Sequence, residues 1–120
     1  MTKTKAIAAT TLALLCAGVV GSGTAGAADP VRKTVKVADN FFSPKRFSVP
    51  RNSVIVWKWS RLNGEAHDVY ALRKPAGAAR FQSAPAATDF TYKRKLRKAG
   101  VYKIICTFHE DMGMRIAVTR

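Results

Sequence analysis

The chain has 120 residues and a formal net charge of +14, because 21 lysines and arginines oppose only 7 acidic residues. We expect a chain of this length to form one small domain with one hydrophobic core. It contains no internal repeat and no low-complexity tract.

The N-terminal segment has the pattern of an export signal. Lys3 and Lys5 precede an apolar stretch at residues 6–20, and small residues ending in Ala25-Gly26-Ala27 follow. This order of charged, apolar and small residues is typical of a cleaved signal peptide. We therefore expect residues 1–27 to be removed. An uncleaved membrane anchor is the alternative, and the short apolar core argues against it.

Cleavage would leave residues 28–120 as the mature domain, secreted or periplasmic, with no further stretch long enough to span a membrane. Cys16 would be discarded, so Cys106 would be its single thiol. Nineteen basic side chains would remain against seven acidic ones, a net charge of +12.

Strand-like alternation is the strongest periodic signal in the mature domain, and helical periodicity is absent. Proline and glycine separate the apolar runs as turns, while residues 73–88 are expected to form a surface loop with a helical turn. The pattern predicts an all-β, antiparallel Greek-key sandwich of about seven strands. The expected strands are residues 31–37, 47–49, 54–59, 67–72, 90–96, 101–106 and 114–118.

A candidate metal site follows the strand at residues 101–106. Parity places Cys106 on its inward face with Tyr102 and Ile104, opposite Lys103. The run Cys106-Thr107-Phe108-His109-Glu110-Asp111-Met112 then brings a thiolate, an imidazole and a thioether into one short segment. His67 is the second histidine of the chain. Two imidazoles, one thiolate and a weak thioether are typical of a blue-copper electron-transfer site.

Each of these residue types also has an ordinary role in proteins. A methionine in a strand-rich domain is usually core filler, and a lone histidine is usually a hydrogen-bonded surface or core group. An unpaired cysteine is harder to explain in an exported protein, because oxidising compartments convert spare thiols to disulfides. Zinc is the alternative metal, since it also binds one cysteine and two histidines. The methionine in the same segment argues against zinc as the bound metal.

The mature chain resembles the cupredoxin family, which includes plastocyanin, amicyanin and pseudoazurin, in three places. One is Asp39-Asn40-Phe41-Phe42-Ser43-Pro44, followed by Phe47-Ser48-Val49-Pro50 and Val54-Ile55-Val56-Trp57. Another is His67-Asp68-Val69, where the family has its first histidine ligand. The third matches the pattern Gly-x-Tyr-x-x-x-Cys-x-x-His from Gly100 to His109.

The resemblance implies that His67, Cys106 and His109 are equatorial ligands of one mononuclear copper ion. It leaves Met112 and Met114 as candidates for the axial ligand. An amicyanin-like loop, Cys-x-x-His-x-x-Met, has the same offset to the last strand as Met112 has here, so Met112 is preferred over Met114.

The chain departs from the family pattern around these ligands. Phe108, Glu110 and Met114 stand where proline and glycine are common, which makes the rigidity of the loop less certain. Asp68 occupies a position that often holds asparagine. We expect Asp68 to hydrogen-bond Thr107 and thereby link the two ligand segments, since ligand loops need such support. A solvated Asp68 is the alternative.

The resemblance implies a one-electron carrier rather than an enzyme, and no nucleophile–base pair or paired-carboxylate motif points to catalysis. A copper storage or delivery protein and a metal-free basic binding module are the alternatives. In similar proteins partners dock at the edge of the second histidine, here His109. Phe108, Met114, Phe41 and Phe42 are candidates for a surrounding hydrophobic patch, and a place in the core is the alternative for each.

The positive charge predicts an acidic redox partner and a rate of encounter that falls with added salt. Peripheral contact with an anionic envelope or membrane surface is the second expected partner, and nucleic acid is not expected for an exported protein. The densest basic run, residues 93–98, predicts a strand with a basic outer face, which is either solvated or a docking surface. We expect a monomer.

Overall fold

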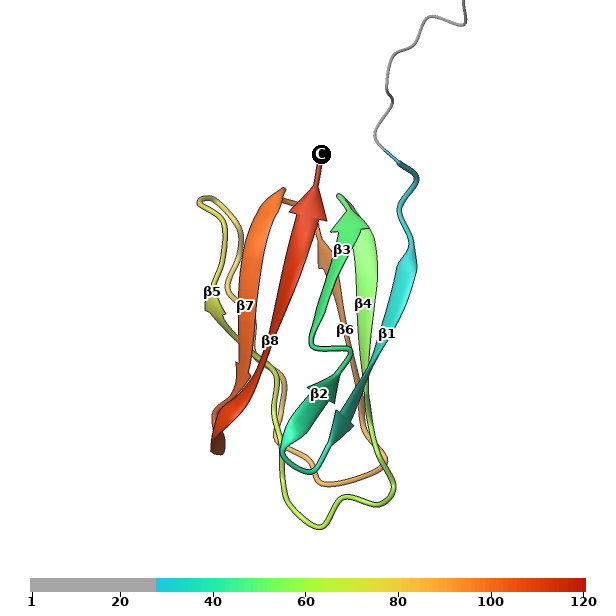
Figure 1. Ribbon diagram of the computed structural model, residues 1–120, viewed down its shortest axis with the longest axis vertical. Coiled ribbons are helices and arrows are strands. Elements are labelled where there is room, and N and C mark those ends of the chain that lie inside the picture. The colour runs from blue at the N-terminus through green and yellow to red at the C-terminus, as the bar shows by residue number, and fades with distance from the viewer. Residues whose placement is uncertain (1–27) are drawn as a thin grey trace, which may run out of the picture.

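The computed structural model describes residues 28–120, which form two four-stranded sheets packed face to face (Figure 1). One sheet has the strand order β2-β1-β4-β6 and the other β3-β8-β7-β5. The expected signal peptide at residues 1–27, with Cys16, lies outside the described residues. The strands are β1 (Arg32–Ala38), β2 (Phe41–Ser43), β3 (Arg46–Pro50), β4 (Ser53–Trp59), β5 (Tyr70–Arg73), β6 (Thr91–Leu96), β7 (Gly100–Cys106) and β8 (His109–Thr119).

The predicted all-β sandwich is confirmed, with eight strands rather than seven. The extra strand is β2, whose three residues are too few to show an alternating pattern. Most pairs are antiparallel, but β1 pairs with β4, and β3 with β8, in parallel. No helical residue occurs within residues 28–120, so the helical turn expected at 73–88 is wrong. Within the same span, no helix is long and apolar enough to cross a bilayer.

The core lies between the sheets and is dominated by aromatic and β-branched side chains. Trp57 on the central strand β4 is fully buried and packs against Phe81 and Tyr92, with ring centroids 6.1 and 5.8 Å away. Phe81 belongs to the long loop between β5 and β6, so this loop closes one side of the core rather than lying on the surface. Each such buried side chain stabilises the fold by about 1.5–3 kcal/mol.

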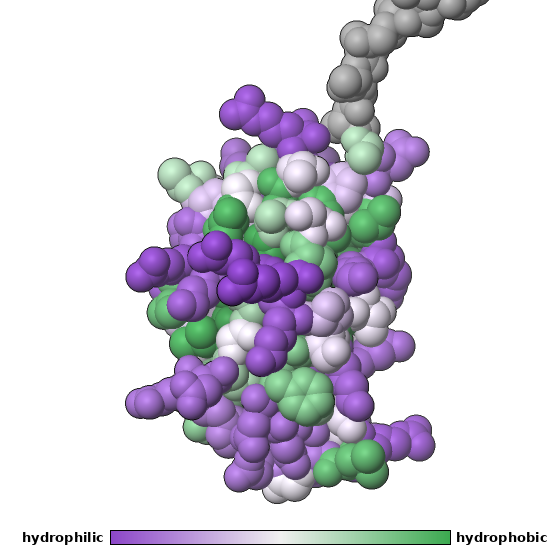
Figure 2. Space-filling view, viewed as in Figure 1, coloured by the Kyte–Doolittle hydropathy of each residue, from purple (hydrophilic) through white to green (hydrophobic). Residues whose placement is uncertain are grey.

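The β7–β8 hairpin carries the expected inward and outward faces. Tyr102, Ile104 and Cys106 are each at most 2% exposed, whereas Lys103 points outward opposite Arg115. The sheet that contains this hairpin, β3-β8-β7-β5, has polar side chains across the middle of the surface shown in Figure 2. Alternation along β7 therefore directs the thiol into the protein, as the sequence predicted.

Strand β8 begins at His109, five residues earlier than expected. The connection from β7 is only Thr107 and Phe108, so pairing resumes at once, with Cys106 opposite His109. The next pair is Ile105 with Gly113. Residues 110–112 therefore have no partner on β7 and form a bulge, which bends the strand locally and re-aims its side chains.

Candidate metal centre

The spacing Cys-x-x-His has a direct structural meaning in this chain. Cys106 ends β7 and His109 begins β8, and the two residues are cross-strand partners on either side of a two-residue turn. Directly opposite residues in an antiparallel pair have Cβ atoms roughly 4.5–5.5 Å apart. The hairpin alone therefore brings the thiol and one imidazole into reach of a common ion.

His67 reaches the same place from the connection between β4 and β5. The expected strand at 67–72 begins only at Tyr70, and His67 instead forms an isolated bridge with Ala86. Its amide donates to the Ala86 carbonyl at 2.9 Å, and its own carbonyl accepts the Trp59 indole N–H at 3.2 Å. The backbone of His67 is thus fixed on both sides, and its side chain is fully buried.

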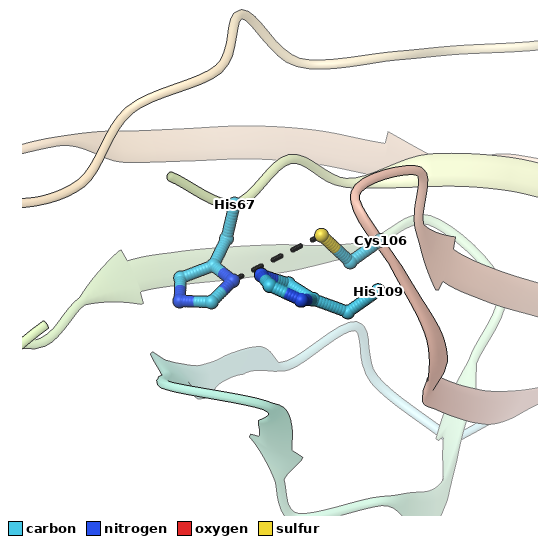
Figure 3. A group of neighbouring side chains, drawn as sticks. All are labelled: His67, Cys106 and His109. Atoms are coloured by element: carbon cyan, nitrogen blue, oxygen red, sulfur yellow. Dashed lines mark hydrogen bonds between the residues drawn. The ribbon is translucent and has the colours of Figure 1, made fainter. Parts of the chain in front are cut away.

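The side chains of His67, Cys106 and His109 converge in Figure 3. One ligand atom from each lies within 4.8 Å of the other two, and Cys106 Sγ is 3.9 Å from His67 Nδ1. Metal bonds of about 2.0–2.3 Å to such donors place three atoms of a trigonal plane roughly 3.5–4 Å apart. Small side-chain rotations would bring all three residues onto one ion, so this donor set fits a mononuclear metal.

The donor atoms of Cys106 and His109 are both shielded from solvent. Burial raises the pKa of the Cys106 thiol, so in the absence of metal it remains protonated at neutral pH and points toward His67 Nδ1. His109 Nε2 is buried without a hydrogen-bond partner in the described part of the chain, and the nearest carboxylate oxygen, on Glu65, is 3.6 Å away. Such an orphaned nitrogen is costly unless a ligand occupies the site.

The two methionines occupy different environments. Met112 lies in the β8 bulge, is 1% exposed, and lines a hollow of about 370 Å³ together with His109 and Phe108. Met114 lies farther along β8, opposite Ile104, and its sulfur accepts the Trp57 indole N–H at 3.3 Å. The Met114 thioether is therefore engaged in the core, whereas Met112 is adjacent to the ligand cluster.

Asp68 makes the link to Thr107 that the sequence predicted. One carboxylate oxygen accepts the Thr107 amide at 2.7 Å, and the other accepts the Thr107 hydroxyl at 2.6 Å and the Gln82 side-chain amide at 3.0 Å. Asp68 is 2% exposed, so it is a buried charge and not a solvated strand residue. Each hydrogen bond to it joins the His67 segment to a neighbouring loop.

Two acidic residues that the sequence did not predict for the site lie beside the histidines. Asp39 Oδ1 is 2.8 Å from His67 Nε2, and Glu65 faces His109. The hydrogen bond from the Gly64 amide, followed by that from His67, lowers the pKa of Asp39. Asp39 is 28 residues from His67 in the chain, and no spacing rule connects the two. Only the folded arrangement of the loops reveals the contact.

Comparison with known proteins identifies the family. Residues 30–119 match the family of copper binding proteins described as plastocyanin/azurin. The chain therefore belongs to this family, as its resemblance to cupredoxins implied. Among curated protein sequences, none matches the chain.

Similar solved structures support the same fold. A copper-containing nitrite reductase from Thermus scotoductus SA-01 has a TM-score of 0.64 and 25% identity over 77% of this chain, but the chain spans only 23% of the reductase. A reduced amicyanin mutant has a TM-score of 0.64 and 20% identity, covering 73% of this chain and 82% of the amicyanin. A purple cupredoxin from Nitrosopumilus maritimus has a TM-score of 0.60 and 18% identity, covering 72% of this chain and 99% of the cupredoxin.

The family and the ligand cluster lead to the same cofactor. The cluster of His67, Cys106 and His109 combines the imidazole and thiolate donors that copper prefers, and the family is one of copper-binding proteins. The cofactor is one mononuclear copper ion.

Replacing Asp68 with Ala should destabilise the copper-free protein by about 2–3 kcal/mol, because hydrogen bonds to a buried charge are lost together. Urea unfolding of the copper-free protein measures this change. Asp68→Asn is the matched control: its amide oxygen still accepts the Thr107 N–H, and the expected loss is about 1 kcal/mol. Equal stability of wild type and Asp68→Ala would show that the link is unimportant.

Proposed function

We propose that the protein is a type 1, or blue, copper protein that carries single electrons outside the cytoplasm. His67, Cys106 and His109 would hold the copper in a trigonal plane, with Met112 as the weak axial ligand. The convergence of three ligand atoms within 4.8 Å carries this proposal. The bound copper would supply the chemistry by alternating between Cu(I) and Cu(II).

The protein's own contribution is to hold the ligands still. Cys106 and His109 are fixed as strand partners, and His67 is held by backbone hydrogen bonds to Ala86. Burial excludes water from Cys106 and His67, which are at most 1% exposed. A ligand set that moves little between two oxidation states favours rapid electron exchange, because little reorganisation accompanies each transfer.

Met112 is the preferred axial ligand for two reasons. It lies in the bulge beside His109 and lines the same hollow, and Met114 already accepts a hydrogen bond from Trp57. A bulge re-aims side chains next to functional sites, which suits a residue that must turn toward the ion. Met114 is then a core residue.

Electrons would enter and leave at the exposed edge of His109. Its side chain is 23% exposed, whereas His67 is fully buried, so His109 is the nearer of the two imidazoles to solvent. Phe108, 54% exposed, and Phe41, 40% exposed, provide apolar contact surface, while Phe42 is fully buried and belongs to the core. A partner would dock over His109 and Phe108.

Electron carriage is favoured over catalysis. The nitrite reductase with a similar fold is a copper enzyme, but this chain spans less than a quarter of it. Within residues 28–120, His67, Cys106 and His109 form the one cluster of histidine, cysteine and acidic side chains arranged to hold a metal. A single buried centre of this kind offers no open position for a substrate and suits outer-sphere transfer of an electron.

The N-terminal segment of the sequence supports an exported location. A signal peptide at residues 1–27 would deliver the domain of residues 28–120 to the periplasm or the medium as a monomer. Its partner would be a redox protein with an acidic surface, steered by the net charge of +12. The same charge favours peripheral contact with an anionic envelope or membrane surface.

The densest basic run and the acidic side chains near His109 occupy different parts of the molecule. Strand β6 and residues 97–98 carry five lysines and arginines, which line a groove of about 500 Å³ together with Phe81 and Tyr102. Glu65, Glu110 and Asp111 are exposed at the ligand end, near His109. The basic groove would therefore guide the encounter, while contact at His109 favours neutral or basic residues on the partner.

Titration of the copper-free mature protein with Cu(II) tests the proposed function. We expect one equivalent to produce an intense blue absorption band and the electron paramagnetic resonance signal of a type 1 site. Cys106→Ser should remove the band, because the thiolate ligand is lost. A colourless protein that holds Cu(I) would instead indicate storage or delivery, and no stoichiometric copper would indicate a metal-free binding module.

Substitution of the methionines identifies the axial ligand. Met112→Leu should raise the reduction potential and alter the visible spectrum, since a weak sulfur ligand to copper is removed. Met114→Leu has the same change in side chain and should affect stability without altering the spectrum. Spectroelectrochemical titration measures both potentials. A spectral change confined to Met114→Leu would assign the axial position to Met114.

Small redox probes test the charge prediction. Oxidation of the Cu(I) protein by hexacyanoferrate(III), an anion, should slow severalfold as ionic strength rises from about 0.01 to about 0.2 M, because salt screens the attraction. The cationic tris(phenanthroline)cobalt(III) should show the opposite trend. Lys93→Gln with Lys95→Gln should weaken the effect of salt on the anion, and Glu110→Gln with Asp111→Asn should strengthen it. Stopped-flow absorbance measures the rates, and equal salt dependence in both double variants would contradict the prediction.

A further inference from the structure

The two ring nitrogens of His67 have different partners on opposite sides of the imidazole. Its Nδ1 faces Cys106 Sγ at 3.9 Å, and its Nε2 is 2.8 Å from Asp39 Oδ1. An ionised carboxylate can only accept a hydrogen bond, so Nε2 carries the proton and Nδ1 presents its lone pair to the ligand cluster. The contact with Asp39 therefore selects the tautomer that a metal ligand requires.

Asp39 is itself held in place. It follows β1, and its two carboxylate oxygens accept the amides of Gly64 at 2.9 Å and Glu65 at 3.3 Å. Both amides belong to the loop that leads to His67, so the carboxylate and the imidazole are fixed to one backbone segment. The Asp39 side chain is 38% exposed while the imidazole is fully buried, so the carboxylate stands between His67 and solvent.

We propose that Asp39 is a positioning residue that orients His67 and holds down the reduction potential of the copper. The inference rests on the proposed function. A carboxylate that accepts the distal N–H of a ligating histidine makes the imidazole a stronger donor, and its negative charge lies one ring away from the ion. Both effects favour Cu(II) over Cu(I), because the more positive ion gains more from a strong donor and a nearby anion.

A purely structural role for Asp39 is the competing explanation. The hydrogen bonds from Gly64 and Glu65 could serve only to close the loop after β4, as many turn aspartates do. A structural role would alter stability but would leave the redox equilibrium and the tautomer of His67 unchanged. Measurements of those two properties separate the explanations.

The experiment compares Asp39→Asn and Asp39→Ala with Asp29→Asn. Asp29 precedes β1 and Asp39 follows it, so the control removes the same charge at the opposite end of that strand. Asp39→Asn keeps an oxygen acceptor and should shift the ratio of Cu(I) to Cu(II) about tenfold toward Cu(I), equal to a potential about 59 mV higher. Asp29→Asn should shift this ratio by less than about twofold.

Nitrogen-15 NMR of the imidazole rings in the copper-free protein provides the second measurement. Wild type and Asp39→Asn should both show His67 protonated at Nε2, whereas Asp39→Ala should show a mixture of tautomers. Equal potentials in Asp39→Asn and Asp29→Asn, or an unchanged tautomer in Asp39→Ala, would overturn the proposal. If Asp39→Ala does not fold, the reduction potential of Asp39→Asn alone decides whether the proposal holds.

Failure of the proposed function would be recognised separately. A wild-type protein that produces no blue band contradicts electron carriage, and the tautomer measurement in the copper-free protein still decides whether Asp39 positions His67.

Discussion

The buried carboxylate of Asp68 is the constraint on which the ligand geometry depends. His67 comes from the connection after β4, whereas Cys106 and His109 belong to the β7–β8 hairpin, and Asp68 joins these segments through the amide and hydroxyl of Thr107. A buried charge is costly unless its oxygens are satisfied, and Gln82 provides a further donor. If Asp68 moved away from Thr107, an unpaired charge would remain in the protein. The two segments therefore hold together as one unit.

Sequence patterns predict the parts of the site that depend on local geometry. Alternation along β7 places Cys106 inward, and the spacing to His109 fits a tight turn, so this half of the site follows from the chain itself. His67 could be chosen because the chain has only one other histidine. The early start of β8 was not predictable, because a bulge at residues 110–112 interrupts the alternation. Strand β2 was missed because three residues carry too little periodic signal.

The features of the site that sequence patterns did not predict depend on contacts between distant loops. The role of Asp39 could not be predicted, since nothing in the sequence indicates that the turn after β1 lies beside the loop before His67. The distribution of charge over the surface could not be predicted from sequence either. Net charge is a property of composition, yet six of the seven acidic residues lie in or beside the connections at the ligand end, and only the fold gathers them there. A strongly basic protein thus has its copper ligands among carboxylates.

The departures from the family pattern explain why this site depends on hydrogen bonds. Proline restricts a loop through the backbone alone, whereas this chain has Phe108 and Glu110 on either side of His109. In place of proline, β8 extends to His109, Asp68 ties Thr107 to the His67 segment, and Asp39 holds the far side of the His67 ring. Charged hydrogen bonds also set the electrostatic field at the ligands, which a proline cannot do. The residues that hold the ligand loops together therefore also place negative charge beside the copper ligands.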